Sequence, residues 1–182
     1  MEPQLLVLDL DETLVFATES ALTRPADFVA CGLYHVYARP HVHHFLVRCG
    51  RHFELAVWTS SSEDYAAEIV DHLFPDRAGL RFVWGRERCT LYADLERGTS
   101  HWLKDLKKIA KLGFGLERVL VVDDSPEKLR RNYGNHIAVT PYEGDPADDE
   151  LLALAAYLQS LRAAGDVRTI EKRGWRKHLA DP

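Results

Sequence analysis

The sequence has no long apolar run and only a few cysteines, which argues against a membrane-spanning protein and against a disulfide-rich one. The longest apolar stretches are only long enough for a strand, so none is expected to cross a membrane. The first expected strand begins within a few residues of Met1, which leaves no room for a signal peptide. Cys31, Cys49 and Cys89 are odd in number and have no CxxC spacing, which favours reduced thiols in a cytoplasm over a disulfide framework.

Internal repeats, low-complexity stretches and an excess of positive charge are also absent. The formal net charge of -5 argues against a protein that coats nucleic acid without sequence preference. With 182 residues, the chain is long enough to bury one core and short enough to be a single domain. We expect this domain over residues 1–165, followed by a basic tail over residues 166–182.

The most informative stretch is an apolar strand near the N-terminus that ends at two carboxylates. Residues 5–8 are all apolar, which is typical of a parallel strand buried on both faces, and Asp9 and Asp11 follow on one side of the chain. Two anions this close repel each other, so we expect a cation or a shared proton beside them. For this motif alone, an ordinary acidic turn after a strand is the alternative.

The same pattern returns late in the chain. Residues 118–122 form a second apolar strand, which ends at Asp123 and Asp124 and is followed by a helix start at Pro126. Capping of that helix is the plain interpretation of this second acidic pair. Ligands of open α/β sheets bind at the carboxyl ends of the strands, so the two acidic pairs together predict oxygen ligands for one hard cation such as Mg²⁺.

The remaining segments alternate between strands and helices, which predicts a doubly wound, Rossmann-like α/β fold with a parallel sheet. Strands are expected over residues 53–58, 80–84 and 137–140, and helices over residues 39–49, 62–73, 100–112 and 147–164. A hairpin is expected within residues 16–37, and a small β insertion over about residues 85–99. No gap between the motifs is long enough for a large cap domain.

Hydroxyl and basic side chains near the strand ends are candidates for binding an anion. Thr59 and Ser60 begin a hydroxyl cluster between a strand and the next helix, where free N–H groups and the helix dipole favour an anion. Capping of that helix by Ser62 is the plain alternative. Lys104 is one of four lysines on the helix predicted over residues 100–112, and periodicity alone does not select it.

Two other groups of side chains have both a plain and a functional interpretation. His41, His43 and His44 are expected on a helix surface rather than in a metal site, because no carboxylate or cysteine completes a ligand set at suitable spacing. The basic tail is predicted to be a solvated terminal helix, with an anion-binding arm as the alternative.

Four motifs in order give the sequence a resemblance to the haloacid dehalogenase (HAD) superfamily. Within it, the sequence most resembles the small C-terminal-domain phosphatases, also called NLI-interacting-factor-like phosphatases. The motifs are Asp9-Leu10-Asp11-Glu12-Thr13-Leu14-Val15, Trp58-Thr59-Ser60-Ser61, Lys104-Asp105-Leu106 and Asp123-Asp124-Ser125-Pro126. The resemblance runs from about Leu5 to the end of the helix predicted over residues 147–164.

This resemblance implies a phosphatase that works through an aspartyl phosphate. Asp9 would be the nucleophile, and Asp11 would be the general acid and then the general base. Mg²⁺ would be bound by the Asp9 carboxylate, the Asp11 backbone carbonyl and Asp124, with Asp123 beside it.

The resemblance also implies which residues would hold the substrate. Thr59, Ser60 and Lys104 would bind the phosphate oxygens, since positioning and charge neutralisation carry most of phosphoryl-transfer catalysis. The short gaps between the motifs leave the site without a large lid, so it is open to a phosphorylated side chain on a protein. Arg86 and Arg88 in the insertion would contact such a substrate.

Departures from the family pattern leave the individual substrate open. Thr18, Glu19 and Ser20 stand where eukaryotic members place aromatic residues that bind a proline-rich peptide. The expected substrate is phosphoserine or phosphothreonine on a protein, and the sequence does not identify that protein. A phosphatase for nucleic-acid ends or small phosphate esters is the alternative enzyme. A phosphopeptide-binding module without catalysis is the alternative from another class, and the intact Asp9 and Asp11 argue against it.

Overall fold

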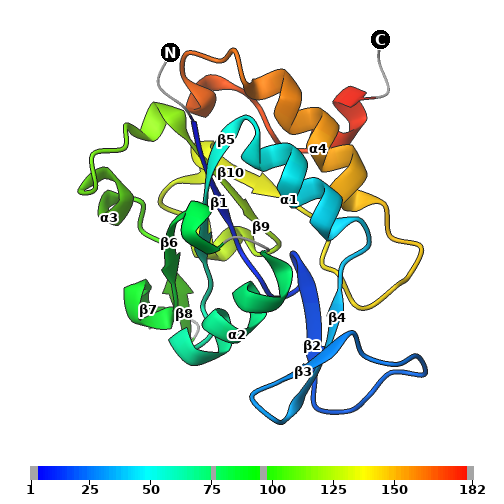
Figure 1. Cartoon of the computed structure of the whole chain (residues 1–182). Coiled ribbons are helices and arrows are strands. Elements are labelled where there is room, and N and C mark those ends of the chain that lie inside the picture. The colour runs from blue at the N-terminus through cyan, green and yellow to red at the C-terminus, as the bar shows by residue number, and fades with distance from the viewer. Residues whose placement is uncertain (1–3, 75–76, 95–97, 180–182) are drawn as a thin grey trace.

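A parallel sheet of five strands lies at the centre of the computed structural model, which describes residues 4–74, 77–94 and 98–179. Its strands are β1 (Gln4–Leu8), β5 (Phe53–Trp58), β6 (Leu80–Trp84), β9 (Val119–Asp123) and β10 (His136–Ala138). The spatial order is β10-β9-β1-β5-β6, and each neighbouring pair is parallel. Because the chain starts in the middle and extends to both edges, the predicted doubly wound sheet is confirmed (Figure 1).

Strand β1 contributes apolar side chains to both faces of this sheet. Leu6 and Leu8 are buried in the larger apolar cluster, whereas Leu5 and Val7 are buried in the smaller cluster on the other face. Both faces are covered, so the strand needs an unbroken apolar run instead of alternation. The helices are α1 (Val42–Gly50), α2 (Glu63–Leu73), α3 (Lys107–Ala110) and α4 (Glu150–Leu161). Helices α1, α2 and α4 contribute to the larger cluster, and α3 to the smaller one.

Two small antiparallel sheets flank the central one. The segment after β1 forms a three-stranded sheet in the order β2-β4-β3, one strand more than the predicted hairpin. These strands are β2 (Val15–Thr18), β3 (Phe28–Ala30) and β4 (Tyr34–Ala38). The insertion is a hairpin of β7 (Thr90–Asp94) and β8 (Thr99–Leu103).

The helix predicted over residues 100–112 is wrong in its first half. Residues 99–103 belong to β8, which pairs with β7, and only Lys107–Ala110 is α-helical. Trp102 is 37% exposed on the hairpin, whereas Leu106 and Ile109 are buried in the core. The ladder with β7 satisfies the backbone of this segment and overrides its helical periodicity. Lys104 therefore directly follows a strand.

The helix predicted to start at Pro126 is also wrong, because only a 3₁₀ turn, Pro126–Leu129, forms there. The helix after β5 begins as predicted. Ser62 caps it, and its Oγ accepts a hydrogen bond from the Tyr65 N–H at 3.4 Å.

The basic tail packs on the domain, so the prediction of a solvated terminal helix is wrong. Its described part contains two 3₁₀ turns, Val167–Thr169 and Trp175–Leu179. Trp175 is 3% exposed, stacks on Tyr157 with ring centroids 5.3 Å apart, and donates its indole N–H to the Ala138 carbonyl at 2.7 Å. Carboxylates of the protein itself pair with the tail cations Arg168, Arg173 and Arg176.

Cys31, Cys49 and Cys89 are all free thiols, as predicted. Across the described ranges, no helix has both the length and the apolar character needed to cross a bilayer.

We expect Trp175→Ala to lower the free energy of unfolding by about 3–5 kcal/mol, because it removes a buried aromatic side chain that closes one side of the core. Urea denaturation followed by circular dichroism measures the loss. Leu179→Ala, in the same turn at a 39% exposed position, is the matched control and should cost about 1 kcal/mol or less. Equal stability of Trp175→Ala and wild type would show that the tail does not contribute to the fold.

Candidate active site

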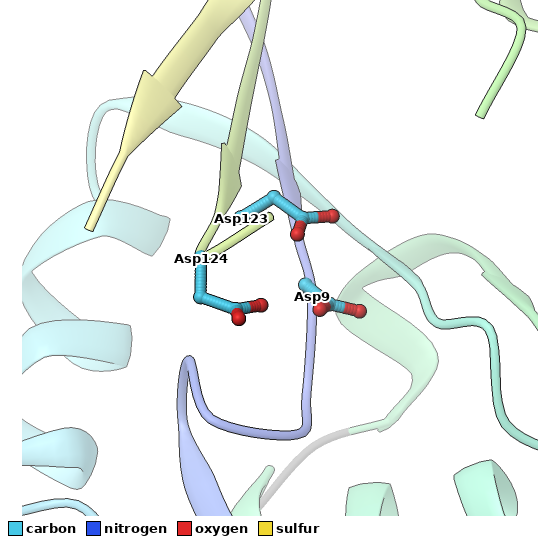
Figure 2. A group of neighbouring side chains, drawn as sticks. All are labelled: Asp9, Asp123 and Asp124. Atoms are coloured by element: carbon cyan, nitrogen blue, oxygen red, sulfur yellow. The ribbon is translucent and has the colours of Figure 1, made fainter. Parts of the chain in front are cut away.

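The candidate site lies where β1 and β9 end side by side. Leu8 of β1 pairs with Val122 of β9, and the Asp9 N–H continues the ladder by donating to the Val122 carbonyl at 3.0 Å. Asp9 and Asp123 thus leave adjacent strand ends, and both are fully buried. Figure 2 shows their carboxylates and that of Asp124 gathered at this edge. The structure therefore brings the two predicted acidic pairs together.

A tight turn after β1 positions Asp11. The Leu10 carbonyl accepts hydrogen bonds from the N–H groups of Thr13, Leu14 and Val15, at 3.2, 2.8 and 3.1 Å. Glu12, inside this turn, has a left-handed backbone with φ of 55°. The turn reverses the chain within a few residues and keeps Asp11 next to the end of β1.

Arg39 fixes this turn to a distant loop. Its guanidinium is buried and forms a bidentate pair with Asp148, with both N–O distances at 2.8 Å. It also donates to the carbonyls of Thr13 at 3.1 Å and Thr140 at 2.9 Å. One planar group therefore joins the turn that carries Asp11 to residues more than a hundred positions later.

Lys104 lies between the two buried carboxylates. Its Nζ donates to Asp9 Oδ1 at 2.8 Å and to Asp123 Oδ2 at 2.5 Å. All three side chains are almost completely shielded from solvent, where unpaired charges would be strongly unfavourable. Periodicity did not distinguish this lysine from its neighbours, but the end of the β7–β8 hairpin places it at the carboxylates.

Lys128, a residue that the sequence analysis did not select, approaches the same carboxylates. Its Nζ is 3.0 Å from Asp9 Oδ2, 3.4 Å from Asp123 Oδ1 and 3.7 Å from Asp124 Oδ1. Burial lowers the pKa of Lys128, but the surrounding carboxylates outweigh this effect and raise the pKa well above its usual range. The available sequence signal was its spacing of four residues from Asp124, which does not reveal a contact with Asp9.

The Asp11 carboxylate accepts hydrogen bonds from three hydroxyl groups. Tyr65 donates to Oδ1 at 2.6 Å, and Ser61 and Thr59 donate to Oδ2 at 2.7 and 3.4 Å. Burial, and then the negative charge of Asp11, raise the pKa of Tyr65, so its hydroxyl stays protonated as a donor. The roles of Ser61 and Tyr65 as Asp11 partners were not predicted, although Ser61 belongs to the hydroxyl cluster that begins at Thr59.

The two arginines predicted in the insertion lie in the 3₁₀ turn Arg86–Arg88, where they contact a backbone carbonyl and aromatic rings. Arg86 donates from Nε to the Ser60 carbonyl at 2.7 Å, and its guanidinium lies 5.9 Å from the centroid of the Trp102 ring. Arg88 lies over Trp84, 5.4 Å from the ring centroid. Arg86 thus borders the hydroxyl loop after β5, whereas Arg88 packs on an aromatic ring.

The carboxylate group fits a divalent cation. Asp9, Asp123 and Asp124 each offer an oxygen within 4.8 Å of the others, and Asp124 Oδ1 is buried without a hydrogen-bond partner. Carboxylate oxygens are the preferred ligands of hard cations such as Mg²⁺. Burial, and then the charges of Asp11 and Asp124, raise the pKa of Glu12 to about 7, and the positive charge of Lys128 opposes this shift.

The histidines of helix α1 and its start show no comparable grouping. His41, His43 and His44 are exposed, as predicted. Across the part of the chain that the structure describes, the three aspartates are the single set of three or more such side chains with ligand atoms this close.

The sequence matches a family of phosphatases and several curated proteins. The model of the family described as NLI interacting factor-like phosphatase matches residues 4–168. CTD nuclear envelope phosphatase 1 of Xenopus tropicalis is 33% identical over 189 aligned positions, which cover 96% of this chain and 74% of the relative. Nuclear envelope morphology protein 1 of Schizosaccharomyces pombe is 31% identical, over 91% of this chain and 34% of its own length.

The fold also matches solved structures. Fcp1, an essential RNA polymerase II CTD phosphatase, superimposes with a TM-score of 0.68 at 20% identity. The match covers 88% of this chain and 62% of the Fcp1 chain. The carboxylates described above therefore lie in the same fold as this solved structure.

We expect Lys104→Met to lower the free energy of unfolding by about 3–5 kcal/mol, because it removes the ammonium group that donates hydrogen bonds to two buried carboxylates. Chemical denaturation without added metal measures this loss. Lys111→Met, at an exposed position of the same segment, is the matched control and should stay within about 0.5 kcal/mol of wild type. Adding Asp123→Asn to Lys104→Met should recover part of the loss. A Lys104→Met protein as stable as the control would contradict the assigned ion network.

Proposed function

The chain belongs to the NLI interacting factor-like phosphatase family, and from this membership we propose that it is a Mg²⁺-dependent phosphomonoesterase acting through an aspartyl phosphate on Asp9. The surroundings of the Asp9 side chain support this proposal. Asp9 is buried at a strand end, one of its oxygens is held by Lys104, and its carboxylate belongs to a group of three that fits a divalent cation.

Asp9 would be the nucleophile. A carboxylate oxygen of Asp9 forms a bond to phosphorus while the bond between phosphorus and the ester oxygen breaks. Asp11 must be in its protonated carboxyl form for this step, and it gives that proton to the leaving alkoxide. Water then attacks the phosphorus of the aspartyl phosphate and gives a proton to Asp11, so inorganic phosphate leaves and both carboxyl groups return to their starting states.

The hydroxyl groups around Asp11 support its role as the proton carrier. Tyr65 and Ser61 hold the two oxygens of Asp11 from the start of helix α2, which fixes the carboxyl group relative to Asp9. A general acid must meet its proton acceptor within hydrogen-bond reach, and two short hydrogen bonds restrict where this carboxyl group can lie.

Lys104, Thr59 and Ser60 would bind the phosphate oxygens. A lysine ammonium group has three donors, and Lys104 uses two of them for Asp9 and Asp123, which leaves one for the substrate. Thr59 and Ser60 lie in the loop between β5 and helix α2, whose N-terminus favours an anion. These groups would stabilise negative charge where it develops in phosphoryl transfer.

Mg²⁺ would be held by the Asp9 carboxylate, the Asp11 backbone carbonyl and Asp124, with Asp123 beside it. When bound, it would supply positive charge that offsets the repulsion between an anionic nucleophile and an anionic phosphate. Asp124 Oδ1 is buried and accepts no hydrogen bond, which supports this ligand set, because such an oxygen is stabilised by a cation.

The proposed substrate is phosphoserine or phosphothreonine on a protein. Within the described ranges the insertions are a three-stranded sheet and a two-stranded hairpin, both too small to enclose a metabolite as a lid domain does. Arg86, beside the Ser60 carbonyl, is a candidate contact for residues flanking the phosphate, with Arg88 further along the insertion. A cytoplasmic location stays a prediction from the free thiols.

Hydrolysis of an aryl phosphate, with Mg²⁺ and with a chelator, tests the proposed reaction. We expect release that depends on Mg²⁺ and that falls by roughly three orders of magnitude or more in Asp9→Asn. Asp11→Asn should lose hydrolysis of a phosphoserine peptide more severely than hydrolysis of the aryl ester, because an aryl leaving group needs less protonation. Undiminished release by Asp9→Asn would contradict the nucleophile assignment, and full activity in the chelator would contradict the metal requirement.

A further inference from the structure

We propose that Lys128 is a built-in cation that competes with the divalent metal, so that it must withdraw from the three carboxylates for the metal to bind. The proposal rests on the metal site of the proposed function and adds a residue that sets its affinity. Lys128 would stabilise the metal-free protein and would raise the metal concentration that the enzyme needs.

The two lysines divide the carboxylate oxygens between them. Lys104 holds Asp9 Oδ1 and Asp123 Oδ2, whereas Lys128 faces the other oxygen of each residue, Asp9 Oδ2 and Asp123 Oδ1. Lys128 also faces Asp124 Oδ1. The residues around the Lys128 ammonium are therefore the same three that form the candidate metal group.

The Lys128 ammonium group is shared among three carboxylates. Its three oxygen distances of 3.0, 3.4 and 3.7 Å include one ordinary hydrogen bond, to Asp9 Oδ2. A lysine ammonium acts as a compact point charge, which suits such shared contacts. Mg²⁺ binds oxygens at about 2.0–2.1 Å. A metal on Asp9 Oδ2 and Asp124 Oδ1 would thus face a like charge at close range, and the two cations exclude each other.

Withdrawal of Lys128 needs only a side-chain movement. Its backbone is held, since the Lys128 carbonyl accepts from the Lys104 N–H at 2.8 Å and its N–H donates to the Ser125 carbonyl at 3.2 Å. The side chain is 18% exposed, whereas that of Lys104 is fully buried. A flexible four-carbon stem can rotate toward solvent from such a partly open position. Lys104 is therefore the fixed cation of the site and Lys128 the exchangeable one.

The charges around the site explain why one cation should replace the other. Three carboxylates face two ammonium groups, and removal of Lys128 without replacement would leave their anionic charge largely uncompensated. A divalent cation restores the balance. Loss of the Lys128 charge should therefore weaken the metal-free protein and strengthen metal binding, a pair of opposite effects that a purely structural lysine would not produce.

Direct Mg²⁺ binding by the full chain tests the competition. Isothermal titration without substrate should give Lys128→Met an affinity about tenfold or more above that of wild type, because the metal no longer displaces an ammonium group. Lys128→Gln, which keeps donors but removes the charge, should behave like Lys128→Met. Lys128→Arg should stay close to wild type or weaker. The exposed Lys111→Met is the matched control and should not change the affinity.

Thermal unfolding provides a second readout that does not depend on turnover. Metal-free Lys128→Met and Lys128→Gln should melt below wild type, and saturating Mg²⁺ should stabilise them more than it stabilises wild type. Unchanged or weaker Mg²⁺ affinity in both neutral variants would overturn the proposal. Hydrolysis by wild type in a chelator, with no Mg²⁺ binding to any variant, would also overturn it, because Lys128 would then replace the metal. Tighter Mg²⁺ binding by the neutral variants without hydrolysis by wild type would support the competition and refute the proposed function instead.

Discussion

The site depends on the burial of two like charges at the ends of adjacent strands. The register of β1 and β9 places Asp9 and Asp123 next to each other, away from water, where their repulsion would oppose folding. Lys104 offsets this repulsion, because its ammonium group donates a hydrogen bond to one oxygen of each residue. The β7–β8 hairpin then has a structural purpose, because its last strand ends at Leu103 and delivers this lysine.

The same pairing leaves the opposite carboxylate oxygens available for chemistry. The oxygens that Lys104 does not hold face Lys128, and in the proposed competition this is the side on which a metal would bind. Asp11 stands apart from this network, since hydroxyl groups, not lysines, hold its carboxylate. Nearby carboxyl groups thus have different partners, which is a way for one site to contain both a nucleophile and a proton carrier.

The sequence was informative where local pattern and topology coincide. Apolar runs that end in carboxylates predicted the strands and their shared edge, because parallel sheets bring such ends together. It was misleading at residues 100–112, where the spacing of Trp102, Leu106 and Ile109 fits a helix but pairing with β7 decides the structure. The contacts of Lys128 with Asp9 and of Tyr65 with Asp11 join segments distant in sequence, and nothing local indicates them. The prediction for the tail was wrong for a similar reason, since Trp175 is buried against Tyr157 of α4, which lies elsewhere in the sequence.

The most direct test of the mechanism is to trap the phosphoryl group. An aryl phosphate would be mixed with Asp11→Asn in Mg²⁺, quenched in acid within the first turnover, and the digested protein analysed by mass spectrometry. The mechanism predicts a phosphoryl group on the peptide that contains Asp9, at a higher level than in wild type, because the variant lacks the base that activates water. A phosphoryl group on Thr59 or Ser60, or turnover without any phosphorylated Asp9, would contradict it.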